Sequence, residues 1–264
     1  MVSLLPARPE LDIAGIAETA LSPVFAARLP NGIPAAPWTC EAEAILWFDR
    51  AGRAAAHVLP ALVRRRAGPV GVVGAIVRHH RSPVGAHDVV AGAVVYRRGS
   101  RLRTHLGFLA ANSEASLTAG RANWGVPATL GAFAGTSTCG TVTAIDAAVG
   151  APSWTVGVTT REAGPRLPLY LATTVEQQFP GDMLGTAVLR MRCLARPARV
   201  ITTVDSDGEL AAWLGSGRRT ALRLSHLRYT VTPSRLDYRQ PIPGAADIGR
   251  ESEPAARQSA SWSP

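Results

Sequence analysis

Residues 81–96, RSPVGAHDVVAGAVVY, place a short Ser-Pro-Val-Gly segment before a run of valine and alanine. A run this rich in β-branched residues predicts a strand. Alternate side chains on a strand share a face, so Gly85, His87 and Val89 point one way while Asp88 points the other. We therefore expect Asp88 to pair with an arginine on the face of the sheet away from His87.

Other strand-like runs occur along most of the chain, and few helical segments separate them. They are VGVVGAIV (70–77), RLRTHLGFL (101–109), SWTVGVTT (153–160), LYLATTV (169–175), LGTAVLRMRCL (184–194), ARVITTV (198–204) and ALRLSHLRYTV (221–231). This order favours antiparallel pairing in an α+β or barrel-like domain over a doubly wound parallel sheet.

Helical signals are fewer. Residues 50–66, RAGRAAAHVLPALVRRR, predict a helix that Asp49 caps and that stops near Pro60. Residues 120–131, GRANWGVPATLG, are typical of a helix end that runs into a turn.

The two ends of the chain differ from the central domain, residues 39–240. Residues 1–38 carry several prolines in a loose pattern, which predicts an arm that wraps the central domain. Residues 241–264 are rich in proline, serine, alanine and charge without periodicity, which predicts a disordered or loosely docked tail.

All 28 basic residues are arginine, and the net charge is +9. The arginines are scattered, with no interleaved aromatic residues and no recognisable binding motif, so we expect no nucleic-acid partner. Some of them could instead bind an anionic ligand, because a guanidinium matches a carboxylate. No apolar run reaches the roughly 18 residues of a spanning helix and the first residues lack a signal-peptide pattern, so we expect a cytoplasmic protein without a membrane partner.

Cys40, Cys139 and Cys193 are odd in number, far apart and without metal-ligand spacing. The sequence therefore predicts neither a disulfide framework nor a zinc site. We expect three reduced cysteines and no cofactor.

Two segments together, residues 81–96 and AGRANWGVPATLG at 119–131, resemble the acetoacetate decarboxylase superfamily. Members carry an SPVG-containing strand and, about thirty residues later, a Gly-Arg-Glu turn that ends in Pro-Lys-Lys. The resemblance implies a cone-shaped antiparallel β-barrel, or double sheet, with flanking helices and a central pocket, often in a homo-oligomer.

The resemblance also identifies positions at which the family's chemical groups are missing. Anchored on Gly120, Arg121 and Pro127, the Schiff-base lysine falls on Ala128 and its partner lysine on Thr129. Anchored on Gly85, the family's pocket glutamate falls on Val89. Because the chain has no lysine, no side-chain amine can form the iminium that serves as the electron sink, which excludes Schiff-base decarboxylation.

Other groups at the implied pocket could replace this chemistry. If Val89 faces the pocket then His87 does too, which makes His87 the leading catalytic candidate for acid-base work; a hydrogen-bonded structural histidine is the alternative. Candidate substrate-binding residues are Val89, Arg121, Asn123, Trp124, Ala128 and Thr129. For Arg121 the alternative is a helix-end arginine bonded to a backbone carbonyl or an acid. On 101–109, Arg103 and His105 share a polar face that either lines the cavity, where both would bind substrate, or faces solvent.

Two functions follow from this pattern. The first is a lysine-independent enzyme, a lyase or an isomerase or cyclase, that acts by acid-base catalysis on a keto or polyketide-like small molecule in natural-product or antibiotic biosynthesis. The second is a non-catalytic protein of the same fold that senses or carries a small molecule.

Overall fold

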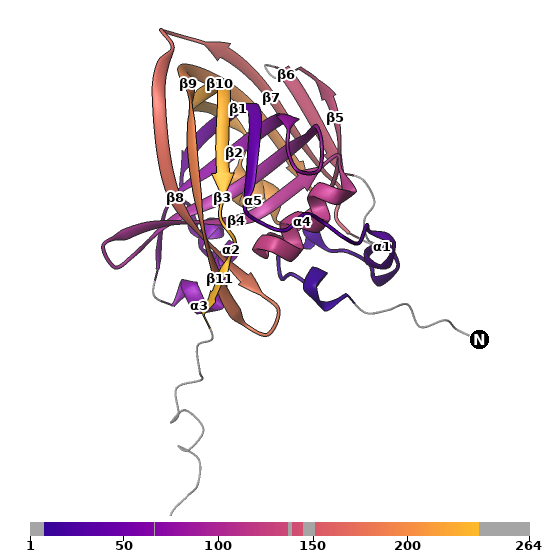
Figure 1. The fold of residues 1–264 in the computed structure, drawn as a ribbon. Helices are drawn as coiled ribbons and strands as arrows, with labels where there is room; N and C mark the ends of the chain where they lie inside the picture. Colours follow the sequence, from indigo (N-terminus) through magenta and orange to yellow (C-terminus); the bar gives the residue numbers. More distant parts are fainter. Residues whose placement is uncertain (1–7, 66, 137–138, 145–150, 238–264) are drawn as a thin grey trace, which may run out of the picture.

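The computed structural model describes residues 8–65, 67–136, 139–144 and 151–237. Its main feature is a large mixed sheet of eleven strands that curls round on itself, with short helices outside it (Figure 1). The fold prediction of a strand-dominated α+β domain with a curled sheet and flanking helices is confirmed. The predicted tail, residues 241–264, lies outside the described residues.

The secondary structure consists of β-strands, short helices and two 3-10 turns in the described residues. The strands are β1 (Trp38–Arg50), β2 (Gly68–Arg81), β3 (His87–Arg98), β4 (Arg101–Ala111), β5 (Ala128–Gly135), β6 (Cys139–Ala144), β7 (Trp154–Glu162), β8 (Leu167–Phe179), β9 (Met183–Ser206), β10 (Gly217–Val231) and β11 (Arg235–Asp237). The helices are α1 (Pro23–Arg28), α2 (Arg53–Val58), α3 (Ala61–Arg64), α4 (Glu114–Trp124) and α5 (Leu210–Leu214), with 3-10 turns η1 (Pro9–Leu11) and η2 (Ala17–Thr19).

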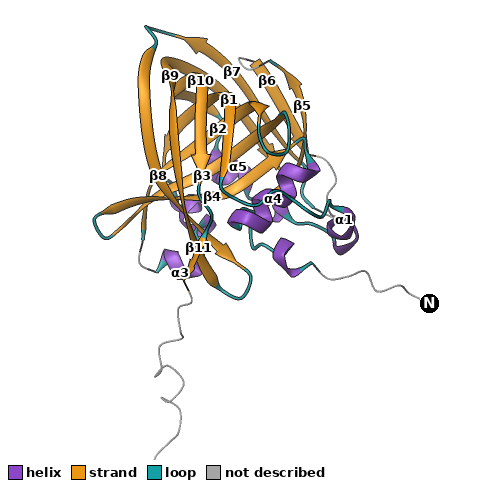
Figure 2. Cartoon of the chain, in the orientation of Figure 1, coloured by secondary structure: helices purple, strands orange, loops and turns teal. Residues whose placement is uncertain are grey.

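Strand pairing closes the sheet. Strands β10, β1, β2, β3 and β4 pair in that order, β4 pairs with β8, β8 with β9, and β9 with β10 (Figure 2). We call this circuit the seven-stranded ring. Strands β5, β6 and β7 form a second path from β4 to β9. Pairing is antiparallel except where β4 meets β5 and β8.

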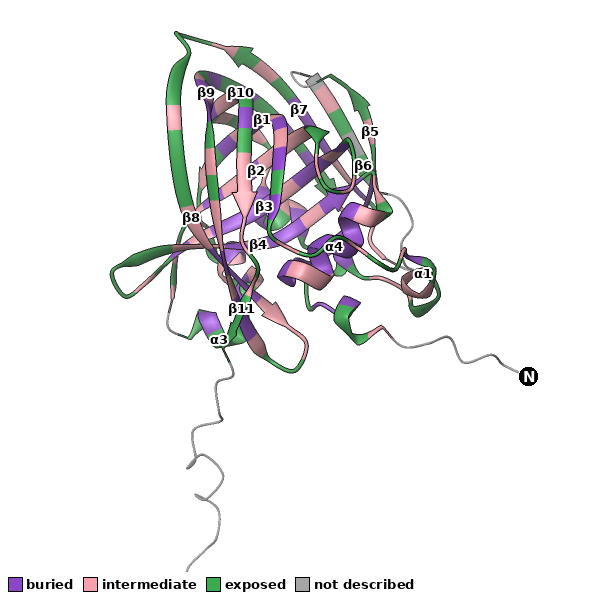
Figure 3. Ribbon diagram, in the orientation of Figure 1, coloured by how far each residue is buried: buried purple, intermediate pink, exposed green. Residues whose placement is uncertain are grey.

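The strands of the ring have two different faces. On β3, His87, Val89, Ala91, Ala93 and Val95 face the inside of the ring, where they line a cavity. The alternate residues Val90, Val94 and Tyr96 belong to the main hydrophobic core, with Trp154 of β7 and Trp213 of α5. The predicted two-residue period of this strand is confirmed, and the protein packs its core outside the ring. In Figure 3 the first half of β8 is mostly exposed.

Several local predictions are corrected by the structure. Asp49 does not cap a helix: it lies near the end of β1, where its carboxylate is 2.6 Å from Nε of Arg219. Helix α2 instead begins after Gly52, without a side-chain cap, and ends before Pro60. The runs 184–194 and 198–204 are one strand, β9. Pro197 is tolerated within it because there the neighbouring strand changes from β8 to β7.

Helix α4 carries the stretch that the sequence predicts as a helix end. The Ser113 hydroxyl accepts a hydrogen bond from the Ser116 amide at its first turn. At its other end Gly125 adopts a left-handed conformation with φ of 63°, and its N–H bonds to the carbonyl oxygens of Gly120 and Arg121. The prediction is confirmed. In the described part of the chain, no helix combines the length and apolar character needed to cross a membrane.

Candidate active site

The inside of the seven-stranded ring holds a cavity of about 730 Å³. Every ring strand contributes to its lining, α4 closes part of it, and none of its lining residues comes from β5, β6 or β7. Most of the lining is aliphatic. One polar cluster lies where β1, β2 and β3 meet α4 and β10: His79, His87, Ser116, Tyr229 and Cys40. Thr104, Thr173, Thr174, Gln177 and Ser234 are the other polar residues of the lining. A large apolar cavity with a few convergent polar groups is typical of a small-molecule site.

His87 is buried, and its hydrogen bonds define the tautomer of its imidazole ring. Its Nδ1 lies 3.1 Å from the carbonyl oxygen of Gly85. A carbonyl oxygen only accepts, so Nδ1 carries the proton and Nε2 accepts the hydroxyl of Ser116, 3.0 Å away. Burial lowers the pKa of His87, against smaller opposing effects of the Gly85 carbonyl and of Asp88. The imidazole is therefore neutral at pH 7, and its Nε2 lone pair, which accepts the Ser116 hydroxyl, is the basic site of the ring.

His79 lies directly against His87. The two rings are stacked, with centroids 4.2 Å apart and planes at 15°. Nδ1 of His79 donates to the carbonyl oxygen of His87 at 3.2 Å, so its Nε2 accepts the phenol proton of Tyr229 at 2.5 Å. Burial, followed by repulsion from His87, lowers the pKa of His79 to about 3. His79 is thus neutral as well.

Tyr229 and Cys40 extend this polar cluster across β10 and β1. Burial raises the pKa of the Tyr229 phenol well above its usual value, and a hydrogen bond with Cys40 adds to the effect. Burial likewise raises the pKa of the Cys40 thiol. Both groups keep their protons at neutral pH. They are hydrogen-bond donors at the same end of the cavity as the neutral base His87.

The cavity runs away from this cluster along the strands. Register places His79 beside His87, whereas Phe48, Val73 and Ala93 lie level with one another further along. The strand from His87 to Ala93 spans roughly 20 Å at about 3.3 Å per residue. Phe48 and Leu102 line this far part and are solvent-exposed, so the cavity opens past apolar side chains.

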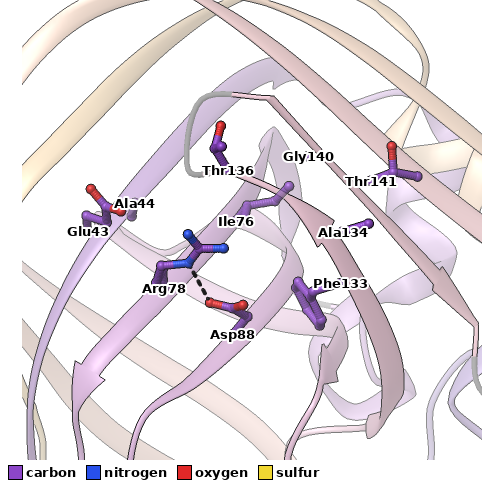
Figure 4. Close-up of a pocket in the computed structure, with 10 residues that line it drawn as sticks. All are labelled: Glu43, Ala44, Ile76, Arg78, Asp88, Phe133, Ala134, Thr136, Gly140 and Thr141. Atoms are coloured by element: carbon purple, nitrogen blue, oxygen red, sulfur yellow. Dashed lines mark hydrogen bonds and ion pairs between the residues drawn. The ribbon is translucent and has the colours of Figure 1, made fainter.

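Asp88 points out of the ring, as its sequence position predicts. Its carboxylate lies 3.1 Å from Nε of Arg78 on the neighbouring strand β2 (Figure 4). The pair faces a small cleft of about 20 Å³, lined on the far side by Phe133 and Thr141 of β5 and β6. The ion pair prediction for Asp88 is confirmed, and Asp88 takes no part in the main cavity.

The two positions aligned with the missing lysines do not line the cavity. Ala128 is fully buried in a cluster with Leu11, Leu117 and Leu130, and Thr129 beside it is also buried. They lie at the start of β5, where Ala128 packs with Leu11 of the N-terminal segment, and neither residue is in the cavity lining. The expectation that Ala128 enlarges the pocket and that Thr129 orients a ligand is corrected.

Arg121 and Asn123 hold the N-terminal arm. Arg121 is buried, and its guanidinium donates to the carbonyl oxygens of Ala128 at 2.8 Å, Leu11 at 2.7 Å and Thr19. Asn123 donates to the carbonyl oxygen of Pro34 at 3.0 Å. Neither residue lines the cavity. For Arg121 this agrees with the alternative of a helix-end arginine bonded to backbone carbonyls. Asn123 has a structural contact in place of the expected substrate contact.

Arg103 and His105 also lie outside the cavity. Leu102, Thr104 and Leu106 line it, so the polar face of β4 points the other way. That face is not open solvent: His105 is buried and Arg103 lies 3.5 Å from the Glu176 carboxylate. Both alternatives for this face, cavity and solvent, are therefore corrected: Glu176 of the neighbouring strand β8 lies beside Arg103, and Val58 of α2 packs on this face at Gly107.

Val89 and Trp124 are where the sequence places them. Both line the cavity, and Trp124 packs edge-on against Trp38 while its Nε1 donates to the carbonyl oxygen of Thr232 at 2.9 Å. Sequence reasoning missed Ser116, His79 and Tyr229. His79, in HHR just before the SPVG segment, could have been found by its position opposite His87 in a β2–β3 hairpin; no local signal singles out the other two.

Solved structures with a similar fold are acetoacetate decarboxylases and acetoacetate decarboxylase-like enzymes. The sequence matches no protein-family model and no curated protein. Among the described residues, no group of three or more His, Cys, Asp and Glu side chains is placed to hold a metal ion.

Three solved structures give the comparison. An acetoacetate decarboxylase from Legionella pneumophila aligns with a TM-score of 0.56 and 13% identity, over 80% of this chain and 90% of its own. An acetoacetate decarboxylase-like enzyme from Sphingomonas wittichii RW1 gives 0.53 and 13%, over 77% and 94%. The enduracididine biosynthesis enzyme MppR, solved with pyruvate, gives 0.51 and 12%, over 77% and 91%. The chain has the acetoacetate decarboxylase-like fold.

Proposed function

We propose that the chain is a lysine-independent enzyme that uses His87 as a base on a carbonyl-containing small molecule in the cavity. The observation that carries the proposal is a neutral imidazole, fixed in one tautomer by the Gly85 carbonyl, in a polar cluster that lines a mostly apolar chamber. A base with its pKa below neutrality is unprotonated and ready to remove a proton.

The neighbouring groups suit removal of a proton next to a carbonyl. His87 takes the α-hydrogen, and negative charge develops on the carbonyl oxygen as the enolate forms. An O–H donor stabilises that charge in a site without bulk water. Tyr229 keeps its proton and lines the same cavity, and it can donate to the oxygen once a ligand competes with His79. The enolate then supports cyclisation, dehydration or another lyase or isomerase step.

The size and lining of the cavity support a substrate larger than a four-carbon keto acid. About 730 Å³ lies in the range that binds drug-sized molecules. Polyketide-like β-dicarbonyl compounds combine acidic α-hydrogens with extended apolar bodies. A step in natural-product biosynthesis is the setting that we propose; placement in the cytoplasm and assembly into a homo-oligomer stay predictions.

The test is proton NMR in heavy water with a panel of β-keto esters and diketones. Exchange or conversion of α-hydrogens in the wild-type protein, reduced at least about 100-fold in His87→Ala, supports the proposal. His80→Ala is the matched control, because His80 is the exposed neighbour of His79 on the same strand. Equal exchange in wild type and His87→Ala, or a covalent adduct trapped by borohydride, would contradict it.

The alternative function is a sensor or carrier without catalysis. The predominantly aliphatic lining favours it, since such a surface binds an apolar molecule without any chemistry. Melting-temperature increases with some panel members, in the absence of any exchange or conversion, would support this alternative.

A further inference from the structure

Ser116 and His87 form a hydrogen-bonded pair whose polarity is fixed. Nδ1 of His87 donates to the Gly85 carbonyl, and Nε2 therefore accepts the Ser116 hydroxyl proton at 3.0 Å. The same carbonyl also accepts from the Ser82 hydroxyl at 2.6 Å. A serine that donates to a histidine, which a third group orients through its other nitrogen, is the arrangement that activates a hydroxyl as a nucleophile.

The pair lies where a bound molecule can reach it. Both side chains line the main cavity although each is buried from bulk solvent. Ser116 is in the first turn of α4, an eleven-residue helix whose positive dipole end therefore lies beside its hydroxyl. That end favours negative charge, such as the oxyanion of a tetrahedral intermediate.

We infer that Ser116 is a nucleophile and that the cavity accepts activated acyl compounds, esters or thioesters with an apolar acyl chain, which acylate it. The inference goes beyond the proposed α-proton chemistry: it uses the same base, His87, on a different proton. The acyl chain would lie along the roughly 20 Å of apolar wall between His87 and the exposed Phe48 end.

The reaction balances with water as the second reactant. A bond forms between Ser116 Oγ and the acyl carbon, and the hydroxyl proton moves to Nε2 of His87. The bond from the acyl carbon to the leaving oxygen or sulfur then breaks, and His87 returns that proton to the leaving group. Water attacks the acyl-serine with His87 as base, and Ser116 Oγ leaves with a proton from His87.

The structure also indicates how specificity arises. The polar cluster offers two neutral imidazoles, a hydroxyl, a phenol and a thiol, whereas the rest of the lining is mostly aliphatic and otherwise carries only uncharged polar groups, such as Thr104 and Gln177. No described arginine lines the cavity. A free carboxylate on the acyl chain would therefore be buried without a cation, so neutral apolar chains are favoured over dicarboxylic half-esters.

The test uses the full-length protein with p-nitrophenyl esters of four, eight and twelve carbons and with an alkyl fluorophosphonate. We expect ester hydrolysis that rises with chain length and stoichiometric phosphonylation, located on Ser116 by peptide mass spectrometry. Ser116→Ala should abolish labelling and lower hydrolysis by about 1,000-fold. His87→Ala should lower both, because the hydroxyl then lacks its base.

Ser100→Ala is the control, since Ser100 is an exposed serine in the turn between β3 and β4. Melting curves establish that each variant is folded. Ser116→Cys keeps a nucleophile at this position, so labelling of that variant would show that Ser116→Ala loses activity through the missing nucleophile and not through altered packing. Absence of labelling in the folded wild-type protein, or labelling of another residue, overturns the inference. The proposed function fails separately, through the α-hydrogen exchange assay on wild-type protein.

Discussion

Nδ1 of His105 lies 3.0 Å from the carbonyl oxygen of Glu176, and this bond ties β4 to β8. Only one residue pair, Thr104 with Val175, is in ladder register between these two described strands. Side chains complete the junction: Gln177 donates to the carbonyl oxygen of Leu106 at 3.0 Å. The seven-stranded ring is therefore closed at β4 and β8 largely by side-chain hydrogen bonds.

The protonation state of His105 makes this junction sensitive to acid. Burial lowers the pKa of His105 to about 4, from 6.5 for the unfolded chain. Between these values the unfolded state binds a proton that the folded state does not, so stability is full above pH 6.5 and is lost as the pH falls toward 4. We expect a loss on the order of 3 kcal/mol at pH 4 from this residue.

Urea unfolding of wild type and His105→Gln at pH 7.5 and pH 4.5 measures this effect. The variant should show a smaller difference between the two pH values, whatever its absolute stability. His80→Gln, at an exposed site, should retain the wild-type difference. An identical pH dependence in wild type and His105→Gln would show that the histidine titrates normally in the folded protein.

Arg121 should be among the most costly arginines to replace. Arg121→Met leaves three backbone carbonyls, those of Leu11, Thr19 and Ala128, without their donor inside the protein. We expect a loss of about 3 kcal/mol or more and faster proteolysis within the N-terminal arm. Denaturant unfolding and limited proteolysis measure both. Arg228→Met, at an exposed position of β10, should stay within about 0.5 kcal/mol of wild type.

Gly107 is the extra residue of a bulge in β4, between the pairs Gly92 with Phe108 and Ala93 with Leu106. A methyl group at Gly107 would lie 2.0 Å from Cγ1 of Val58 in α2. Gly107→Ala should therefore cost about 1–3 kcal/mol through overpacking. The double variant with Val58→Ala should recover part of that loss. A double-mutant cycle with no coupling between the two sites would show that the helix moves away freely.

Filling the middle of the cavity should block ligands without touching its polar end. Ala91 lines the cavity on β3, four residues from His87, so Ala91→Trp should weaken binding of an apolar fluorescent dye by at least about 10-fold. Ala132→Trp, on the exposed side of β5, is the matched control. Equal dye affinity in the two variants would place the binding site outside the ring.

The sequence correctly predicted the orientation of side chains within a single strand. The alternation through His87, Asp88 and Val89 fixed which side chains share a face, because that period belongs to any extended chain. It failed where the partners of a side chain come from a strand that is distant in sequence and pairs alongside. His105 lies 71 residues from Glu176, and nothing in residues 101–109 indicates that β8 packs there.

The partners of His87 show the same limit. Tyr229 is hydrogen-bonded to His79 although the two residues are 150 positions apart in the sequence. Ser116 is hydrogen-bonded to His87 from a helix whose packing depends on the whole ring. The residues that resemble the family's lysine turn predicted the fold correctly, yet Ala128 packs with Leu11 and neither Ala128 nor Thr129 lines the cavity. Short motifs identify a fold through its turns, whereas the orientation of single side chains depends on packing that motifs do not contain.

Strand β9 is shared by the cavity wall and the hydrophobic core. Its first part pairs with β8 and its last part with β7, while β10 runs along its other edge. Neither the ring nor the outer path through β5, β6 and β7 can lose β9 and remain closed. The two halves of the molecule should therefore melt as one cooperative unit, so that any ligand that tightens the cavity also protects amide hydrogens of the core from exchange.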